Sequence, residues 1–262
     1  MLMIEWPQFL KNGLSPGEKL SSMTIGVFDG VHLGHQALIE KVVAHNSNGA
    51  FADSVPVVIT FRQNHKTEET GSLQTFHQKI EMLERLGVKI TLMIDFTESF
   101  RRMGGIEFLE ILLKRGNIGF FAVGSAFHCG YRLDTDAAAI QGFFTSRNVP
   151  VETVPEVMEG SIPVSSSRIR CAIAAGDLST AEKMLGRPYT IDLAAPQDIV
   201  LPPPGRYEVI LREKQEDQGT KAVILIEGGT VRVPEPFADS RWESAEFLPA
   251  SVKGLPHLLF GK

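Results

Sequence analysis

The sequence predicts an α/β protein, in which helices cover both faces of a parallel β-sheet and a smaller β domain follows. Short apolar runs alternate with amphipathic segments through about residue 155. These runs are continuous rather than alternating, as is typical of strands buried on both faces. After Pro188 the character of the chain changes. Alternation of this kind favours βαβ units and therefore a parallel sheet.

The strands expected in this sheet are short runs rich in apolar and β-branched residues. The first ends at Asp29-Gly30, a dipeptide that is typical of turns. The expected strands are residues 23–28, 55–61, 90–94, 119–124 and 151–154.

Amphipathic segments separate these strands, and each places its apolar residues on one helical face. We expect helices from about Leu33 onward and over residues 73–86, 105–115 and 136–147. Two shorter helices are expected within 165–186, where Ser179 is positioned to cap the second and Gly186 to end it.

A domain boundary is expected near residue 187. Residues 1–187 would form the α/β domain and residues 188–262 a small β domain. In the second part, residues 207–212 and 222–226 predict strands, and Gly228-Gly229 predicts a hairpin turn.

Composition excludes several classes of protein. The 262 residues carry a net charge of −5, so any attraction to anions must be local, and we expect no nucleic-acid or membrane partner. No apolar stretch approaches the length of a membrane span, and the N-terminus lacks the pattern of a secretory signal. The two cysteines, Cys129 and Cys171, favour reduced thiols and a cytoplasmic protein. The oligomeric state stays open.

The strongest local signal is GVFDGVHLGHQ, residues 26–36. His32 and His35 are three apart at a helix start, so both imidazoles can face one ligand. The unpaired N–H groups of a first helical turn suit phosphate. Gly30 permits a tight turn, and Gly34 leaves room for a phosphate near the backbone. Surface histidines or metal ligands are the alternatives, but no third ligand lies nearby, so no metal site is assigned.

The second signal is VSSSRIR, residues 164–170. A helix cap needs one hydroxyl, whereas three hydroxyls followed by Arg168 and Arg170 suggest a phosphate clamp. A serine cap with nearby arginines is the alternative.

In this order and spacing, the two motifs resemble those of the prokaryotic FAD synthetase family, the bifunctional riboflavin kinase/FMN adenylyltransferases of the HxGH nucleotidylyltransferase superfamily. TIGVFDGVHLGHQALI is similar to the family's first motif, VSSSRIR to its last, and MLGRPYTI to its junction with the kinase domain. The resemblance covers about residues 20–190, with a faint continuation over 201–209. It implies a Rossmann-like sheet of the nucleotidylyltransferase type and a reduced barrel that remains from a riboflavin kinase domain.

The resemblance implies that AMP is transferred from ATP to FMN, with release of pyrophosphate. The acceptor phosphate is already ionised, so the site must align the substrates and neutralise charge rather than supply a base. His32 and His35 would bind ATP phosphates, Ser166, Ser167 and Arg170 would grip the β- and γ-phosphates, and Mg²⁺ would bridge phosphates. The other implied binding positions are Gly26, Phe28, Asp29, Gly30, Gly34, Asn64, Gly124, Phe127 and Arg168.

This sequence departs from the family pattern in three places. Asn64 stands where the family usually has histidine, and Ala126 stands at a position that is usually polar. After residue 187 there is no Pro-Thr-Ala-Asn motif, so we expect no riboflavin kinase activity. The alternatives are a complete bifunctional enzyme, a nucleotidyltransferase with another acceptor, and a non-catalytic flavin- or nucleotide-binding protein.

Overall fold

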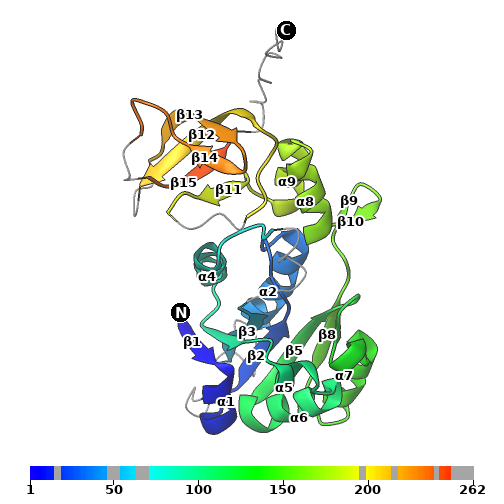
Figure 1. Cartoon of the computed structure of the whole chain (residues 1–262). Coiled ribbons are helices and arrows are strands. Elements are labelled where there is room, and N and C mark those ends of the chain that lie inside the picture. Colours follow the sequence, from blue (N-terminus) through cyan, green and yellow to red (C-terminus); the bar gives the residue numbers. More distant parts are fainter. Residues whose placement is uncertain are drawn as a thin grey trace. The chain divides into compact units, whose positions relative to one another are not determined.

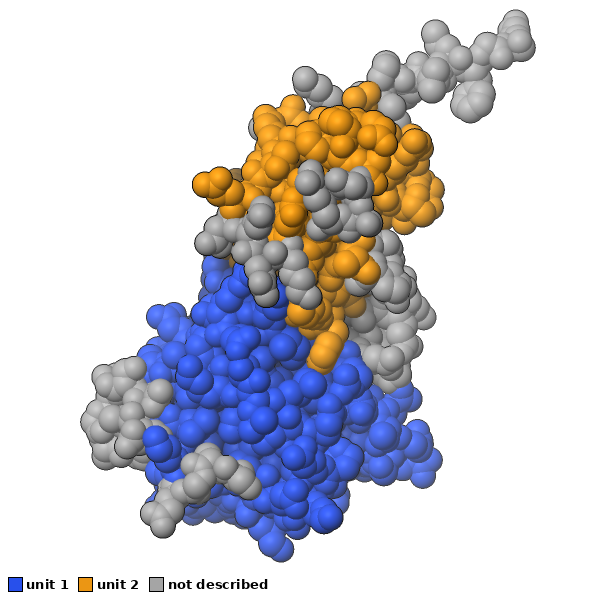
Figure 2. Space-filling view, turned by 90° about the vertical axis from the view of Figure 1, so that its left-hand side faces the viewer, with its two compact units in different colours: residues 1–66, 79–163 blue, residues 67–78, 164–262 orange. Residues whose placement is uncertain are grey.

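The computed structural model describes residues 1–14, 19–45, 54–62, 71–194, 199–213, 218–238 and 242–248. The chain forms two compact units, shown in blue and orange in Figure 2. The first contains Met1–Lys66 and Lys79–Pro163, and the second contains Thr67–Gln78 and Val164–Lys262. The division between the two compact units falls between Pro163 and Val164, before the domain boundary that the sequence predicts near residue 187. That domain boundary stays a prediction.

The first unit contains a six-stranded sheet in which every neighbouring pair of strands is parallel (Figure 1). This arrangement confirms the predicted α/β class. In spatial order the strands are β1 (Leu2–Glu5), β4 (Ile90–Ile94), β3 (Val55–Phe61), β2 (Ser21–Ile25), β5 (Ile118–Gly124) and β8 (Val151–Val154).

Helices cover both faces of this sheet, as the continuous apolar strands predict. On one face, α1 (Trp6–Asn12), α6 (Gly105–Gly116) and α7 (Ala137–Thr145) contribute to the largest apolar cluster. On the other face, α2 (Leu33–His45) and α4 (Phe76–Arg85) pack against the strands through smaller clusters. The short elements of this unit are α5 (Glu98–Arg101), β6 (His128–Cys129), η2 (Tyr131–Leu133), β7 (Thr135–Asp136), β9 (Met158–Glu159) and β10 (Ile162–Pro163).

The prediction that the first strand covers residues 23–28 was wrong at both ends. β2 begins at Ser21, because its two serines satisfy their hydroxyls inside the protein: Ser21 Oγ donates to the Gly116 carbonyl at 2.6 Å and Ser22 Oγ to the Val42 carbonyl at 2.8 Å. It ends at Ile25, and Phe28 has left the extended conformation with φ 53°. Helix boundaries also differ; α4, for example, begins at Phe76 rather than at residue 73.

The second unit contains a five-stranded sheet whose described pairs are antiparallel, which confirms the smaller β domain. Gly228 and Gly229, both with positive φ, form the predicted turn of one of its hairpins. In spatial order the strands are β11 (Thr190–Asp192), β15 (Trp242–Phe247), β12 (Gly205–Glu213), β13 (Thr220–Glu227) and β14 (Thr230–Arg232).

Two helices precede this sheet in the chain, α8 (Ser166–Ala174) and α9 (Leu178–Leu185). The expectation that Ser179 caps α9 was wrong: the side chain of Asp177 accepts the Thr180 N–H at 3.0 Å. Gly186 ends this helix in the left-handed conformation, as predicted. Among the described residues, no helix combines the length and the apolar character needed to cross a bilayer.

Candidate functional site

The candidate site lies where the order of the strands reverses. β2 lies between β3, the next strand along the chain, and β5, which is reached only after β4. The segment Asp29–His35 follows the carboxyl end of β2, and the loop after Gly124 follows the carboxyl end of β5. In open parallel sheets, ligands bind at such a switch point. The two segments singled out in the sequence therefore follow the same edge of one sheet.

His32 and His35 form a stacked pair at the start of α2. Their ring centroids are 3.6 Å apart and the ring planes differ by 17°. The His32 carbonyl accepts the first helical hydrogen bond from Gln36 N at 2.9 Å, so His32 occupies the cap position. The ring of His35 also meets the edge of the Phe28 ring, at a centroid distance of 5.1 Å. The prediction that the two imidazoles share a face is confirmed.

The electrostatic surroundings keep His35 neutral. Burial holds its pKa well below the usual histidine value, and the nearby His32 and then Lys79 lower it further. Within the described part of the chain, the buried Nδ1 of His35 has no hydrogen-bond partner. A neutral imidazole can still donate one N–H, and an approaching anion would raise its pKa. The ring is thus suited to a ligand whose negative charge grows during a reaction.

The loop before the histidines has a positive φ at three positions, Phe28, Gly30 and Val31. Gly30 has φ 78°, as expected for a tight turn, but Phe28 and Val31 also have positive φ, at 53° and 37°. Such conformations cost on the order of 1–3 kcal/mol each in residues with side chains. Complete burial of Phe28 and Val31, at about 1.5–3 kcal/mol each, offsets that cost. Gln36 Nε2 also donates to the Val31 carbonyl at 2.9 Å, so a side chain of helix α2 fixes the loop backbone.

Two other glycines of the motif, Gly26 and Gly34, lie against aromatic rings, where a side chain would crowd the ring. A Cβ on Gly34 would lie 3.3 Å from Nδ1 and Cε1 of His32, and one on Gly26 would lie 3.1 Å from the Phe28 ring. Gly34 was assigned to the approach of a phosphate, which stays a prediction. The structure adds that it leaves clearance for the His32 ring.

Lys79 is a charged group at this edge that the sequence analysis missed. Only 8% of its surface is exposed. Its Nζ donates to the Phe61 carbonyl at 2.9 Å and to the Val27 carbonyl at 3.4 Å. Burial lowers the pKa of Lys79 to about 8, with the buried Asp29 opposing and Arg62 adding to the shift. Its position on the apolar stripe of α4, three residues after Phe76 and four before Leu83, was the signal that could have identified it.

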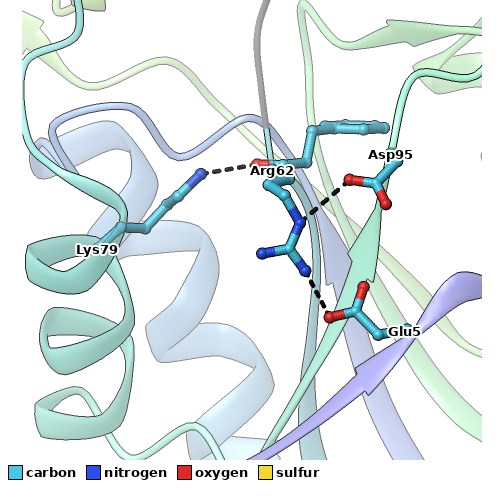
Figure 3. Close-up of polar contacts among 5 residues, drawn as sticks. Glu5, Arg62, Lys79 and Asp95 are labelled. Atoms are coloured by element: carbon cyan, nitrogen blue, oxygen red, sulfur yellow. Dashed lines mark hydrogen bonds and ion pairs between the residues drawn. The ribbon is translucent and has the colours of Figure 1, made fainter. Parts of the chain in front are cut away.

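Arg62, directly after β3, connects three neighbouring strand ends. Its guanidinium group donates to Glu5 at 2.5 Å and to Asp95 at 3.2 Å, as Figure 3 shows beside Lys79. These side chains are well exposed, so the pairs contribute little to stability. Asn64, the next predicted binding residue, lies outside the described residues.

The loop after β5 begins with a tight turn, in which Phe127 N donates to the Gly124 carbonyl at 3.0 Å. The Phe127 side chain is half-buried and packs against the main apolar cluster. Ala126, at the position where the family has a polar residue, is exposed, and its carbonyl lies 3.1 Å from His128 Nδ1. A ligand-binding role for Phe127 or Gly124 stays a prediction.

The serine and arginine motif lies in the second unit, whereas the two histidines lie in the first. Ser165 is the helix cap and accepts the Arg168 N–H at 3.3 Å. Ser166 and Ser167 are therefore the first two residues of α8 and are not needed as caps. Arg170 Nε donates to the Gly71 carbonyl at 2.9 Å. The first turn of α8 thus carries two hydroxyls beyond the one that capping requires.

Among the described residues, no group of three or more His, Cys, Asp and Glu side chains is arranged to hold a metal ion.

Comparisons with known proteins agree with the motifs. The family model of FAD synthetase matches residues 15–168. The bifunctional riboflavin kinase/FMN adenylyltransferase of Escherichia coli (strain K12) is 27% identical over 176 residues, which are 64% of this chain and 55% of that protein. The FAD synthetase of Listeria monocytogenes is 26% identical over 200 residues, 71% of this chain and 79% of that protein.

The chain spans about half the length of the bifunctional relatives that it matches. A solved structure described as a macrolide-efflux protein from Streptococcus pneumoniae has a TM-score of 0.76 at 21% identity, covering 94% of this chain and 90% of that one. At this identity the likeness shows a shared fold only. Because the family model covers more than half of the chain, this protein belongs to the FAD synthetase family.

Proposed function

We propose that this chain is an FMN adenylyltransferase, which transfers AMP from ATP to FMN and releases pyrophosphate. An oxygen of the FMN phosphate would attack the α-phosphorus of ATP, and the bond from that phosphorus to the oxygen that leads to the β-phosphate would break. The observation that carries the proposal is the stacked pair of His32 and His35 at the strand-order switch point, in a member of the FAD synthetase family.

The two imidazoles would act as donors to the ATP phosphates. His35 is neutral before ATP binds, and growing charge on the leaving pyrophosphate would raise its pKa and strengthen its hydrogen bond. The start of α2 would contribute N–H groups to the same anion. Since the FMN phosphate is already ionised, none of these groups has to remove a proton.

The remaining predicted residues keep their roles as proposals. Ser166, Ser167, Arg168 and Arg170 of α8 would bind phosphate, and Gly124, Phe127 and Asn64 would contribute to the flavin or nucleotide site. Mg²⁺ would be carried on the ATP phosphates and neutralise part of their charge. ATP and FMN are the small-molecule partners that we propose.

We also propose that the chain does not phosphorylate riboflavin. No Pro-Thr-Ala-Asn sequence occurs after residue 187, although the curated relatives named above include bifunctional kinases. The five-stranded sheet of the second unit would then have another role, such as supporting the neighbouring helices of its own unit.

The test is a product assay with the purified full chain, ATP, Mg²⁺ and either FMN or riboflavin. We expect FAD and pyrophosphate in equal amounts from FMN, and no FMN from riboflavin. A His35→Asn variant should lose FAD formation, while His77→Asn, at an exposed histidine, should retain it.

Absence of FAD at every pH and Mg²⁺ concentration would overturn the proposal. Pyrophosphate release with a different phosphorylated acceptor would indicate another nucleotidyltransferase, and ATP binding without turnover would indicate a non-catalytic protein.

A further inference from the structure

Lys79 lies where the pairing of two site-bearing strands ends. β2 and β3 are paired as far as Ile25 and Ile59, and beyond this point the chain of β2 turns away toward the histidine loop. The carbonyls of Val27 and Phe61, just beyond the last pair, both accept from the Lys79 ammonium group. Lys79 therefore bridges the two strand ends from α4, as Figure 3 shows for its contact with β3.

The bridge adjoins the strained part of the loop. Val27 precedes Phe28, the first residue with positive φ, and its carbonyl also accepts from Thr60 Oγ1 at 3.0 Å. Positive φ in a bulky residue persists only where its surroundings determine the backbone. The Thr60 hydroxyl and the Lys79 ammonium both donate to the Val27 carbonyl, and Asp29 lies close enough to act on Lys79 electrostatically.

Packing in the apolar core alone does not explain why residue 79 is a lysine. Burying an ammonium group is costly, and an apolar side chain of similar length would pack on the stripe of α4 without that cost. A buried and perturbed titratable group beside a ligand-binding edge is typical of functional sites. Its charge also interacts electrostatically with Asp29 in the loop and with His35 on α2.

We propose that Lys79 is a positioning residue for adenylyl transfer: its charged ammonium group fixes the backbone from Val27 to Asp29 and thereby sets the place of the His32 and His35 rings. This inference rests on the proposed function for its kinetic consequences, but the contacts that support it do not depend on which acceptor is used.

The proposal makes activity depend on pH through Lys79. The charged groups that face it are Asp29 in the loop, Arg62 at the end of β3, and the neighbouring His35 on α2. With a pKa of about 8, Lys79 is largely charged at neutral pH and loses its proton in the mildly alkaline range. The ratio kcat/KM, which reports groups in the free enzyme, should therefore fall above about pH 8.

The experiment compares the wild-type chain with Lys79→Met, Lys79→Arg and the control Lys114→Met, at an exposed lysine of α6. We expect Lys79→Met to lower kcat/KM for ATP on the order of 10²-fold at pH 7, because small displacements of catalytic groups have effects of this size. Lys79→Arg should restore much of the activity and keep it up to pH 9.5, since arginine stays charged. Lys114→Met should behave as the wild type.

Wild-type activity and pH profile in Lys79→Met would overturn the proposal, as would an alkaline decline that persists in Lys79→Arg. If Lys79→Met does not fold, as judged by circular dichroism, the profile of Lys79→Arg decides alone. If the wild-type chain forms no FAD, the proposed function fails separately, and calorimetric binding of ATP replaces activity in the same comparison. ATP affinity should then fall above pH 8 in the wild type but not in Lys79→Arg, and equal declines in both would overturn the positioning role.

Discussion

The rings of His32 and His35 stack at 3.6 Å, so a proton on one ring strongly disfavours a proton on the other. Two unit charges at about this distance repel by roughly 4 kcal/mol at the effective dielectric of a protein surface. Without a bound anion, the two rings are therefore not expected to carry a positive charge at the same time. A polyphosphate bound beside the pair would reduce this repulsion, because its negative charge would raise the pKa of His35.

The depressed pKa of His35 predicts an acid-sensitive fold. Because the folded-state pKa lies below the unfolded value, the unfolded chain binds more protons as the pH falls through about 6.5, and stability decreases there. Thermal melting between pH 7.5 and 5 should show a smaller loss of stability in His35→Gln than in the wild type. Equal losses in the two proteins would show that His35 is not the responsible group.

Gly34→Ala should impair the site without weakening the fold. The added Cβ would press on the His32 ring at 3.3 Å, so we expect kcat to fall on the order of tenfold. Gly142→Ala is the matched control, since a Cβ there meets no atom within 4 Å in helix α7. The control should gain about 0.5–1 kcal/mol of stability and keep full activity. Unchanged kinetics in Gly34→Ala would argue against a role for the His32 ring position.

The serines of α8 allow capping to be separated from phosphate binding. Ser165→Ala removes the cap and should cost about 1 kcal/mol of stability. Ser167 is the second residue of the helix and does not cap it. Ser167→Ala should therefore leave the free energy of unfolding unchanged but raise KM for ATP severalfold. Chemical denaturation and initial-rate kinetics on both variants test this. A Ser167→Ala enzyme with the wild-type KM would remove Ser167 from the proposed phosphate-binding set.

Much of the fold is predictable because its strands are continuous apolar runs. The residues 55–61, 90–94 and 151–154 match β3, β4 and β8. β2 was misplaced because two buried serines at its start look polar in the sequence, while the apolar Val27 and Phe28 at its end belong to a loop. The edge strand β1 was not predicted, because helix α1 begins at Trp6 directly after Glu5 and no turn residue marks the end of the strand.

The site was predictable in its residue types but not in all of its contacts. The spacing of His32 and His35 predicted a shared face, and the Asp29-Gly30 dipeptide predicted the turn in which Gly30 has a positive φ. Lys79 was missed because lysine on an amphipathic helix normally faces solvent, and its burial depends on tertiary contacts with strand carbonyls. Spacing alone cannot distinguish these environments.

The central claim is that the paired imidazoles bind the triphosphate, and histidine-selective NMR tests it most directly. In the chain labelled at histidine Cε1, with His35→Asn used for assignment, the His35 signal should titrate well below pH 6.5 without nucleotide. Saturating ATP should shift this signal and raise the His35 pKa. An unchanged His35 signal and pKa at an ATP concentration that calorimetry shows to be saturating would contradict the account.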